Sequence, residues 1–187
     1  GSLADDTDLG VWQASLGGLT TLDVLAPGQF AGRAAEILGP PIERLGWEAS
    51  PADDDRSRQL RGLVLAAAGT VAAVDHVIAG ARALWDAPID DPAVATAVVV
   101  VVSAHGDADA YAECRERARR AQTAQVEQRH LRALTRFPGS DEVATLLDEL
   151  LDGGIRNQDA PYLLRDALAH QWHRGSVWQA VTDRWDE

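Results

Sequence analysis

The sequence predicts an all-α fold, an α-solenoid of about ten short antiparallel helices in hairpin pairs. Three observations lead to this prediction. Apolar residues recur at helical spacing along most of the chain, and residues that start or end helices separate these stretches. A helix pair repeats roughly every 35–40 residues, which is typical of solenoids built from helical hairpins.

Apolar stripes define most of the helices in order along the chain. The stripes are Trp12, Leu16, Leu19 and Leu22; Ala31, Ala34, Leu38, Pro41, Ile42 and Leu45; Tyr111, Cys114, Ala118 and Ala121; Val143, Leu146, Leu147, Leu150 and Leu151; Leu164, Ala167, Leu168 and Trp172; and Trp178, Val181 and Trp185. Side chains at these spacings share one helical face, so they predict a core. We also interpret Trp85 as a core residue rather than a ligand platform.

Residues that favour helix ends lie between the stripes. Asp91-Pro92 and Asp159-Ala160-Pro161 each place a capping carboxylate just before a proline in the first turn. Ser176 and Gln179 have capping-box spacing. Helices are expected to stop near four glycine positions, which are Gly46, Gly80, Gly106 and Gly153-Gly154. Pro40-Pro41 is expected to bend or break the second helix.

The run Val98–Val102 is the exception to this pattern. Five consecutive β-branched residues favour a buried strand by propensity. We predict a helix instead, because the run follows the capped turn at Asp91, ends at Gly106 and has helical patterns on both sides. An isolated strand would also leave its backbone groups unpaired.

The 187 residues are enough for one domain, which we expect to cover 3–187 with a possible hinge loop at 48–56. Gly1-Ser2 resembles the remnant of a cleaved tag, and the chain contains no Met. We therefore expect it to be a fragment of a longer protein. Neither a signal peptide nor a multi-cysteine framework is present, and we accordingly expect a cytoplasmic location.

Charge and hydrophobicity exclude several classes of partner. The net charge is −12, with 17 basic residues, all Arg, against 29 acidic ones. Such a chain is a poor binder of nucleic acid or of an anionic membrane. The longest apolar runs, Leu63–Val74 and Ala93–Ala104, are too short to span a bilayer, which takes about 20 residues.

The sequence offers no self-contained active site and no predicted metal site. None of the five histidines begins an H-E-x-x-H motif, and His170 with His173 supplies too few ligands for zinc. We interpret this pair as solvated imidazoles near a helix end. Asp107 after Gly106 is interpreted as a helix cap, and Cys114 as a buried apolar residue. The cluster of four arginines between Arg115 and Arg120 is interpreted as a solvated face.

Six short motifs from Leu45 onward nevertheless occur in a distinctive order. They are Leu45-Gly-Trp-Glu48, Arg58–Ala68, Gly106-Asp-Ala-Asp-Ala-Tyr111, His130–Leu134 with Phe137-Pro138, Ile155-Arg-Asn-Gln-Asp-Ala-Pro161, and Trp178 with Trp185. In this order they resemble the C-terminal helical domain of aminopeptidase N-type zinc metallopeptidases. That family includes the puromycin-sensitive and endoplasmic-reticulum aminopeptidases.

The resemblance implies a parent enzyme that releases N-terminal amino acids from peptides by zinc-activated water attack. It places the zinc and the catalytic residues in a separate, N-terminal catalytic domain, so this chain is expected to bind no cofactor and to be inactive alone. Its implied role is a HEAT-like bowl that packs on the catalytic domain and encloses the peptide chamber. Candidate peptide-binding residues are Arg156, Gln158 and Asp159, and then Arg58 and Arg61, which also suit a bracing role.

Two other functions stay open on the sequence. One is a free-standing HEAT- or armadillo-like scaffold that holds a protein partner on its concave face. The other is a helical regulatory protein with a pocket for a small ligand.

Overall fold

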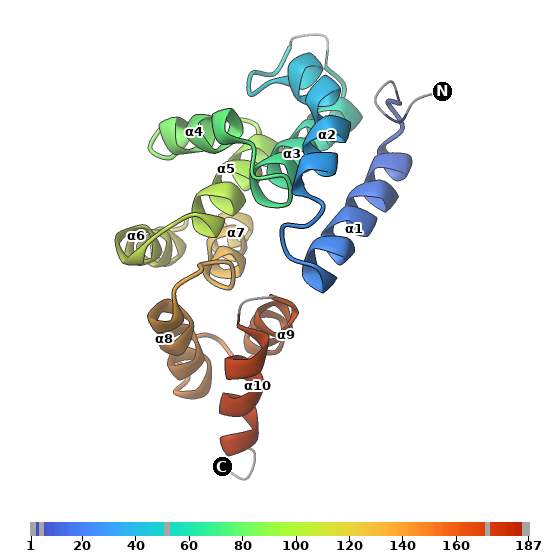
Figure 1. Cartoon of the computed structure of the whole chain (residues 1–187). Helices are drawn as coiled ribbons and strands as arrows, with labels where there is room; N and C mark the ends of the chain where they lie inside the picture. The colour runs from blue at the N-terminus through green and yellow to red at the C-terminus, as the bar shows by residue number, and fades with distance from the viewer. Residues whose placement is uncertain (1–2, 4–5, 51–52, 171–172, 185–187) are drawn as a thin grey trace. The chain divides into compact units, whose positions relative to one another are not determined.

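The computed structural model describes residues 3, 6–50, 53–170 and 173–184, and this part of the chain contains helices and no strands (Figure 1). Its ten α-helices are α1 (Leu9–Leu25), α2 (Ala31–Leu45), α3 (Asp55–Thr70), α4 (Asp75–Leu84), α5 (Pro92–Ala104), α6 (Ala108–Arg119), α7 (Ala124–Leu134), α8 (Ser140–Leu151), α9 (Ala160–Ala169) and α10 (Arg174–Asp183). The predicted all-α, α-solenoid-like class is confirmed. Gly1-Ser2, Trp172 and Trp185 lie outside the described residues.

The chain divides into two compact units, Gly1–Val102 and Ser103–Glu187, each with its own core. The boundary falls near the end of α5. The predicted hinge at 48–56 lies within the first unit, and α3 already begins there at Asp55. The Asp54 side chain caps this helix by accepting a hydrogen bond from the Ser57 N–H at 2.8 Å.

The first unit is built around α3, which packs against α1, α2 and α4. Trp12 and Leu38 are completely buried between these helices. Leu22, predicted to lie on the core stripe of α1, is 41% exposed and lies outside the core, so that prediction is wrong. The Trp12 Nε1 atom donates a hydrogen bond to the Asp6 carbonyl at 2.8 Å, so the indole is satisfied despite its burial. No single described helix is long and apolar enough to cross a bilayer, although α3 and α4 together pass that test across a 116° bend.

Small residues on α3 allow α5 to approach it closely. A Cβ atom added at Gly62 would lie 2.7 Å from the Ala93 carbonyl oxygen, and one at Gly69 would collide with Val101. These two glycines are seven residues apart and therefore lie on the same helical face. The Val98–Val102 run forms part of α5, which confirms the predicted helix, and Val98 and Val101 are buried.

Two predicted breaks in the first unit do not occur, whereas a bend of the helix at Pro40-Pro41 stays a prediction. The helix α2 continues through Pro40 and Pro41, so the predicted break does not occur. Leu38, Pro41 and Ile42 are all buried, and this packing holds the helix together where the prolines remove backbone donors. Gly80 lies inside α4 rather than at its end. It faces Trp47, whose ring fills the space that a side chain would occupy.

The second unit begins with the α6–α7 hairpin, followed by α8, α9 and α10. Tyr111 and Phe137 make an edge-to-face ring contact, with centroids 5.2 Å apart. Asp107 caps α6 through the Ala110 N–H at 3.1 Å, as predicted. Cys114 is fully buried, also as predicted, and burial raises the pKa of its thiol to about 12.

Three predictions for the last helices need correction. Leu151, the last residue of α8, is 48% exposed and lies outside the core. Trp178 is 56% exposed, because α10 turns its neighbour Val177 inward instead. Ser176 lies inside α10 and donates to the His173 carbonyl at 2.9 Å, so no capping box forms with Gln179.

Candidate functional site

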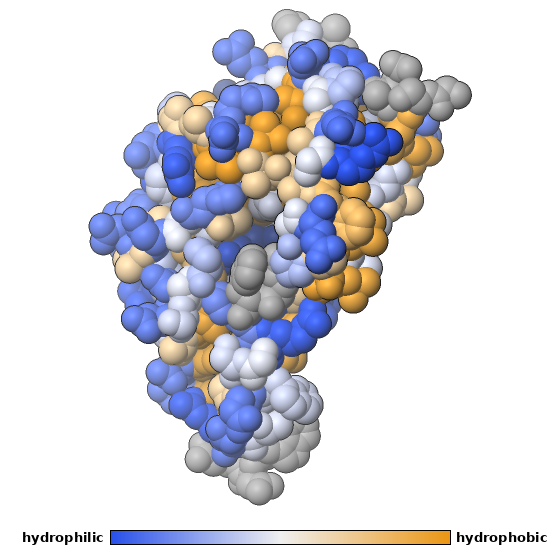
Figure 2. Space-filling model, viewed as in Figure 1, coloured by the Kyte–Doolittle hydropathy of each residue, from blue (hydrophilic) through white to orange (hydrophobic). Residues whose placement is uncertain are grey.

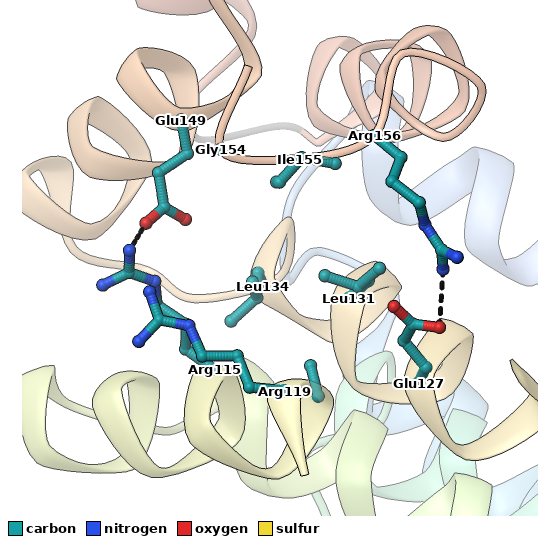
Figure 3. Close-up of a pocket in the computed structure, with 10 residues that line it drawn as sticks. Arg115, Arg119, Glu127, Leu131, Leu134, Glu149, Gly154, Ile155 and Arg156 are labelled. Atoms are coloured by element: carbon teal, nitrogen blue, oxygen red, sulfur yellow. Dashed lines mark ion pairs between the residues drawn. The ribbon is translucent and has the colours of Figure 1, made fainter. Parts of the chain in front are cut away.

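A pocket of about 110 Å³ lies within the second unit, between α6, α7, α8 and the segment that joins α8 to α9 (Figure 3). Its floor is apolar and is formed by Leu131, Leu134 and Ile155. Leu134 and Ile155 are buried, with 0% and 5% exposure, so the floor belongs to the core of the unit. Charged side chains from three helices and the joining segment surround it.

One end of the pocket is formed by an ion pair between Arg115 of α6 and Glu149 of α8. The Glu149 side chain is only 14% exposed, whereas that of Arg115 is 35% exposed. Arg119 lies one turn further along α6 and also lines the pocket. The Arg119 Nη1 atom also lies 3.9 Å from Glu116 Oε2, so each guanidinium at this end has a carboxylate nearby.

The opposite end is formed by Arg156, which precedes α9, and Glu127 of α7. The Arg156 Nη2 and Glu127 Oε2 atoms are 2.5 Å apart, and Arg156 Nε donates to Asp159 Oδ2 at 3.2 Å. The hydrogen bond that Arg156 donates to Glu127, together with the negative charge of Glu127, raises the pKa of Arg156. The Arg156 side chain is still 53% exposed, so it is oriented by two carboxylates and open to solvent.

Asp159 is 9% exposed and stands at the start of α9, but its side chain does not cap that helix. It accepts hydrogen bonds from Gln128 Nε2 at 2.7 Å and from Arg156 instead. The predicted cap is therefore wrong. The carboxylate instead links α7 to the segment that carries Arg156.

The family model of the ERAP1-like C-terminal domain matches residues 1–187. The chain belongs to this family. The resemblance to the C-terminal domain of aminopeptidase N-type enzymes, found on short motifs, is thus confirmed over the whole chain. The comparison of this chain with curated proteins finds no match.

The candidate binding residues of this ERAP1-like domain fall into two groups. Arg156 lines the pocket, and Asp159 orients the Arg156 side chain. Gln158 lies between these two residues in the sequence and is exposed. Arg58 and Arg61 belong to the first unit. Arg58 is exposed, whereas Arg61 is 2% exposed and bonded to the Leu45 carbonyl and to Asp53, which suits the predicted bracing role.

Sequence reasoning missed the other charged residues of the pocket, which are Arg115, Arg119, Glu127 and Glu149. The sequence predicts a solvated face for the arginines, but Arg115 pairs with a partly buried carboxylate on another helix. Glu149 follows Arg115 by 34 positions, a separation that corresponds to no helical period. Only the packing of α8 beside α6 brings the two side chains together.

The described residues contain no cluster of three or more His, Cys, Asp or Glu side chains suited to a metal ion. His170 and His173 stack, with ring centroids 5.3 Å apart. His173 is 5% exposed and its Nε2 donates to the Phe137 carbonyl at 2.8 Å, so the expected solvation of this imidazole is wrong. Burial, then His173 and Arg136, lowers the pKa of His170 from 6.5 to about 4.

Acidification is therefore expected to destabilise the domain through His170. Between pH 6.5 and 4 the unfolded chain binds a proton at this residue and the folded chain does not, so stability falls as the pH is lowered. We expect a contribution on the order of 2 kcal/mol, measured as the change in unfolding free energy between pH 7 and pH 4.5. The variant His170→Phe should lose much of this dependence, whereas a substitution at exposed His76 should keep it. An identical pH dependence in all three proteins would contradict the assignment.

Proposed function

We propose that the chain is the C-terminal accessory domain of a zinc-dependent aminopeptidase that removes N-terminal residues from peptides. In this role it packs on the catalytic domain and helps to enclose the chamber in which the peptide binds. The observation that carries the proposal is the match to the ERAP1-like C-terminal domain along the entire chain. The helical architecture agrees with it, because stacked helical pairs offer a broad surface for an extended ligand.

The pocket supports a contact with the peptide. Arg156 is oriented by Glu127 and Asp159 but remains half exposed, so a carboxylate can approach its guanidinium from the solvent side. Two acidic side chains, Glu127 and Glu149, lie in the same pocket and suit cationic groups. A site with both signs of charge over an apolar floor fits a peptide better than a simple anion. We propose Arg156 as the principal contact, with Asp159 as its positioning residue.

Zinc belongs to the catalytic domain in this proposal. The described residues of the ERAP1-like domain do not fit a zinc site, since no three suitable ligands converge. No step of the hydrolysis is therefore assigned to a side chain of this chain. Its contribution is to bind the peptide at a distance from the reaction and to limit access to the chamber.

The proposal is tested by comparing the 187-residue chain with the enzyme that carries it. Neither aminoacyl-naphthylamides nor peptides should be hydrolysed by the chain alone, while the enzyme hydrolyses both. In the enzyme, Arg156→Ala should raise KM for peptides by roughly tenfold, the loss expected for one charge-assisted hydrogen bond. Its KM for aminoacyl-naphthylamides should stay unchanged, because these substrates are too short to reach the pocket.

Arg165→Ala is the matched control, since Arg165 is an exposed arginine of α9 that pairs with Asp166 and does not line the pocket. If the two substitutions change the KM for peptides equally, Arg156 is not part of the proposed peptide-binding site. Hydrolysis by the isolated chain would overturn the accessory role itself. An upstream coding sequence without an H-E-x-x-H motif would favour the free-standing scaffold instead.

A further inference from the structure

The two ion pairs in the pocket of the second unit differ in how accessible they are. At one end, the side chains of Arg115 and Glu149 are 35% and 14% exposed. At the other end, those of Arg156 and Glu127 are 53% and 30% exposed. A ligand that enters the pocket therefore meets the Arg156–Glu127 pair as its more accessible charged group.

The Arg156–Glu127 pair keeps capacity for further hydrogen bonds. Arg156 directs Nε toward Asp159 and Nη2 toward Glu127, and neither of these contacts uses its Nη1 amino group. Glu127 uses Oε2, and its other carboxylate oxygen lies on the pocket side of the pair (Figure 3). A guanidinium has five N–H donors and a carboxylate has about four acceptor sites, so neither group is saturated by this pairing. The pair therefore offers a donor and an acceptor next to each other.

Charge decides which ligand fits this pair best. A ligand with a carboxylate alone would use Arg156 but would bring its negative charge close to Glu127. A ligand with an ammonium group alone would use Glu127 but would be repelled by Arg156. A free amino acid carries both charges with a single carbon between them. Its carboxylate and its ammonium group can therefore pair with the two neighbouring side chains at once.

The floor and the volume of the pocket select the side chain of such a ligand. Leu131, Leu134 and Ile155 form an apolar floor in a space of about 110 Å³. An apolar cavity of about 150 Å³ holds one benzene molecule, so this space suits a single aliphatic side chain. Figure 2 shows a mainly hydrophilic surface over the part of the view in which Figure 1 places α6. The apolar part of a ligand on this side is thus better accommodated inside the pocket than on the helix surface.

We propose that this pocket binds a free amino acid with an aliphatic side chain, such as leucine. Arg156 holds its carboxylate, Glu127 holds its ammonium group, and the apolar floor receives its side chain. The inference rests on the proposed function for the source of the ligand, because an aminopeptidase releases free amino acids as its product. It also gives the site a regulatory role, since an amino acid on Arg156 excludes a peptide from the same guanidinium.

Titration calorimetry of the unmodified 187-residue chain tests the proposal with four ligands. Leucine should bind saturably. Leucinamide, which lacks the carboxylate, and N-acetylleucine, which lacks the ammonium group, should each bind at least about tenfold more weakly, the loss expected for one charge-assisted hydrogen bond. Alanine keeps both charges but lacks most of the apolar side chain, and it should also lose at least about tenfold in affinity.

Substitutions assign the binding to the two named side chains. Arg156→Gln and Glu127→Gln should each weaken leucine binding by about tenfold. Arg165→Gln is the matched control and should leave it unchanged, because Arg165 is exposed on α9 and does not line the pocket. Circular dichroism confirms that each variant is folded. The ligand series uses the unmodified chain, so it decides the question even if a variant does not fold.

Two results would overturn this inference and leave the proposed function standing. One is N-acetylleucine binding as tightly as leucine, which would assign the pocket to the C-terminal residue of a peptide. The other is no binding of leucine at millimolar concentrations. Leucine binding by the chain, together with an enzyme that lacks aminopeptidase activity, would instead overturn the proposed function and support the amino-acid site.

Discussion

Replacing Arg61 by alanine is expected to lower the free energy of unfolding of the chain by about 3 kcal/mol, the range found when one member of a buried polar pair is removed. The Arg61 side chain is 2% exposed, which is rare for an arginine. Its Nε atom donates to the Leu45 carbonyl at 3.0 Å, and Nη2 lies 2.5 Å from Asp53 Oδ2. Truncation would leave a cavity and would also leave that carbonyl without its donor.

Arg58→Ala is the matched control for this measurement. Arg58 lies one turn before Arg61 on α3 and is exposed, so its loss should change the unfolding free energy by less than about 0.5 kcal/mol. Urea unfolding of the three proteins, followed by circular dichroism, gives the comparison. Similar stability of Arg61→Ala and the unmodified chain would show that the buried guanidinium does not brace α2 against α3.

The helices were largely predictable from the sequence because burial on one helical face leaves a periodic pattern. The stripe of α2 was recovered with Ala34, Leu38 and Ile42 all buried, and the Val98–Val102 run was assigned to a helix against its strand propensity. The predictions were wrong where tertiary packing outweighs the conformational preference of the local sequence. Two prolines did not break α2, and the core position of α10 is Val177 instead of its larger neighbour Trp178.

The pocket was predictable only in part. The motif around Arg156 identified one of its residues, and Asp159 was placed beside it, although with the wrong hydrogen-bond partners. Glu149 and Arg115 could not be paired from the sequence, since residues on α6 and α8 share no period. Resemblance of short motifs indicated the family, but only tertiary packing specifies which charges converge.

Removing the indole of Trp12 is expected to have the largest effect on stability, about 4 kcal/mol for Trp12→Ala. Trp12 is completely buried against the core of the first unit, and its Nε1 atom bonds the Asp6 carbonyl, which precedes the helix. The variant therefore loses the largest buried side chain of α1. It also loses the hydrogen bond that holds the segment just before this helix. Thermal and urea unfolding of the isolated chain measure this loss.

The exposed side of the same helix, which carries Leu22, predicts the opposite behaviour. Leu22→Ala removes a side chain that is already 41% exposed, so the isolated chain should lose less than about 1 kcal/mol. The same thermal and urea unfolding measurements compare Trp12→Ala with Leu22→Ala in the isolated chain. A large loss of stability for Leu22→Ala in the isolated chain would show that both faces already serve its own fold.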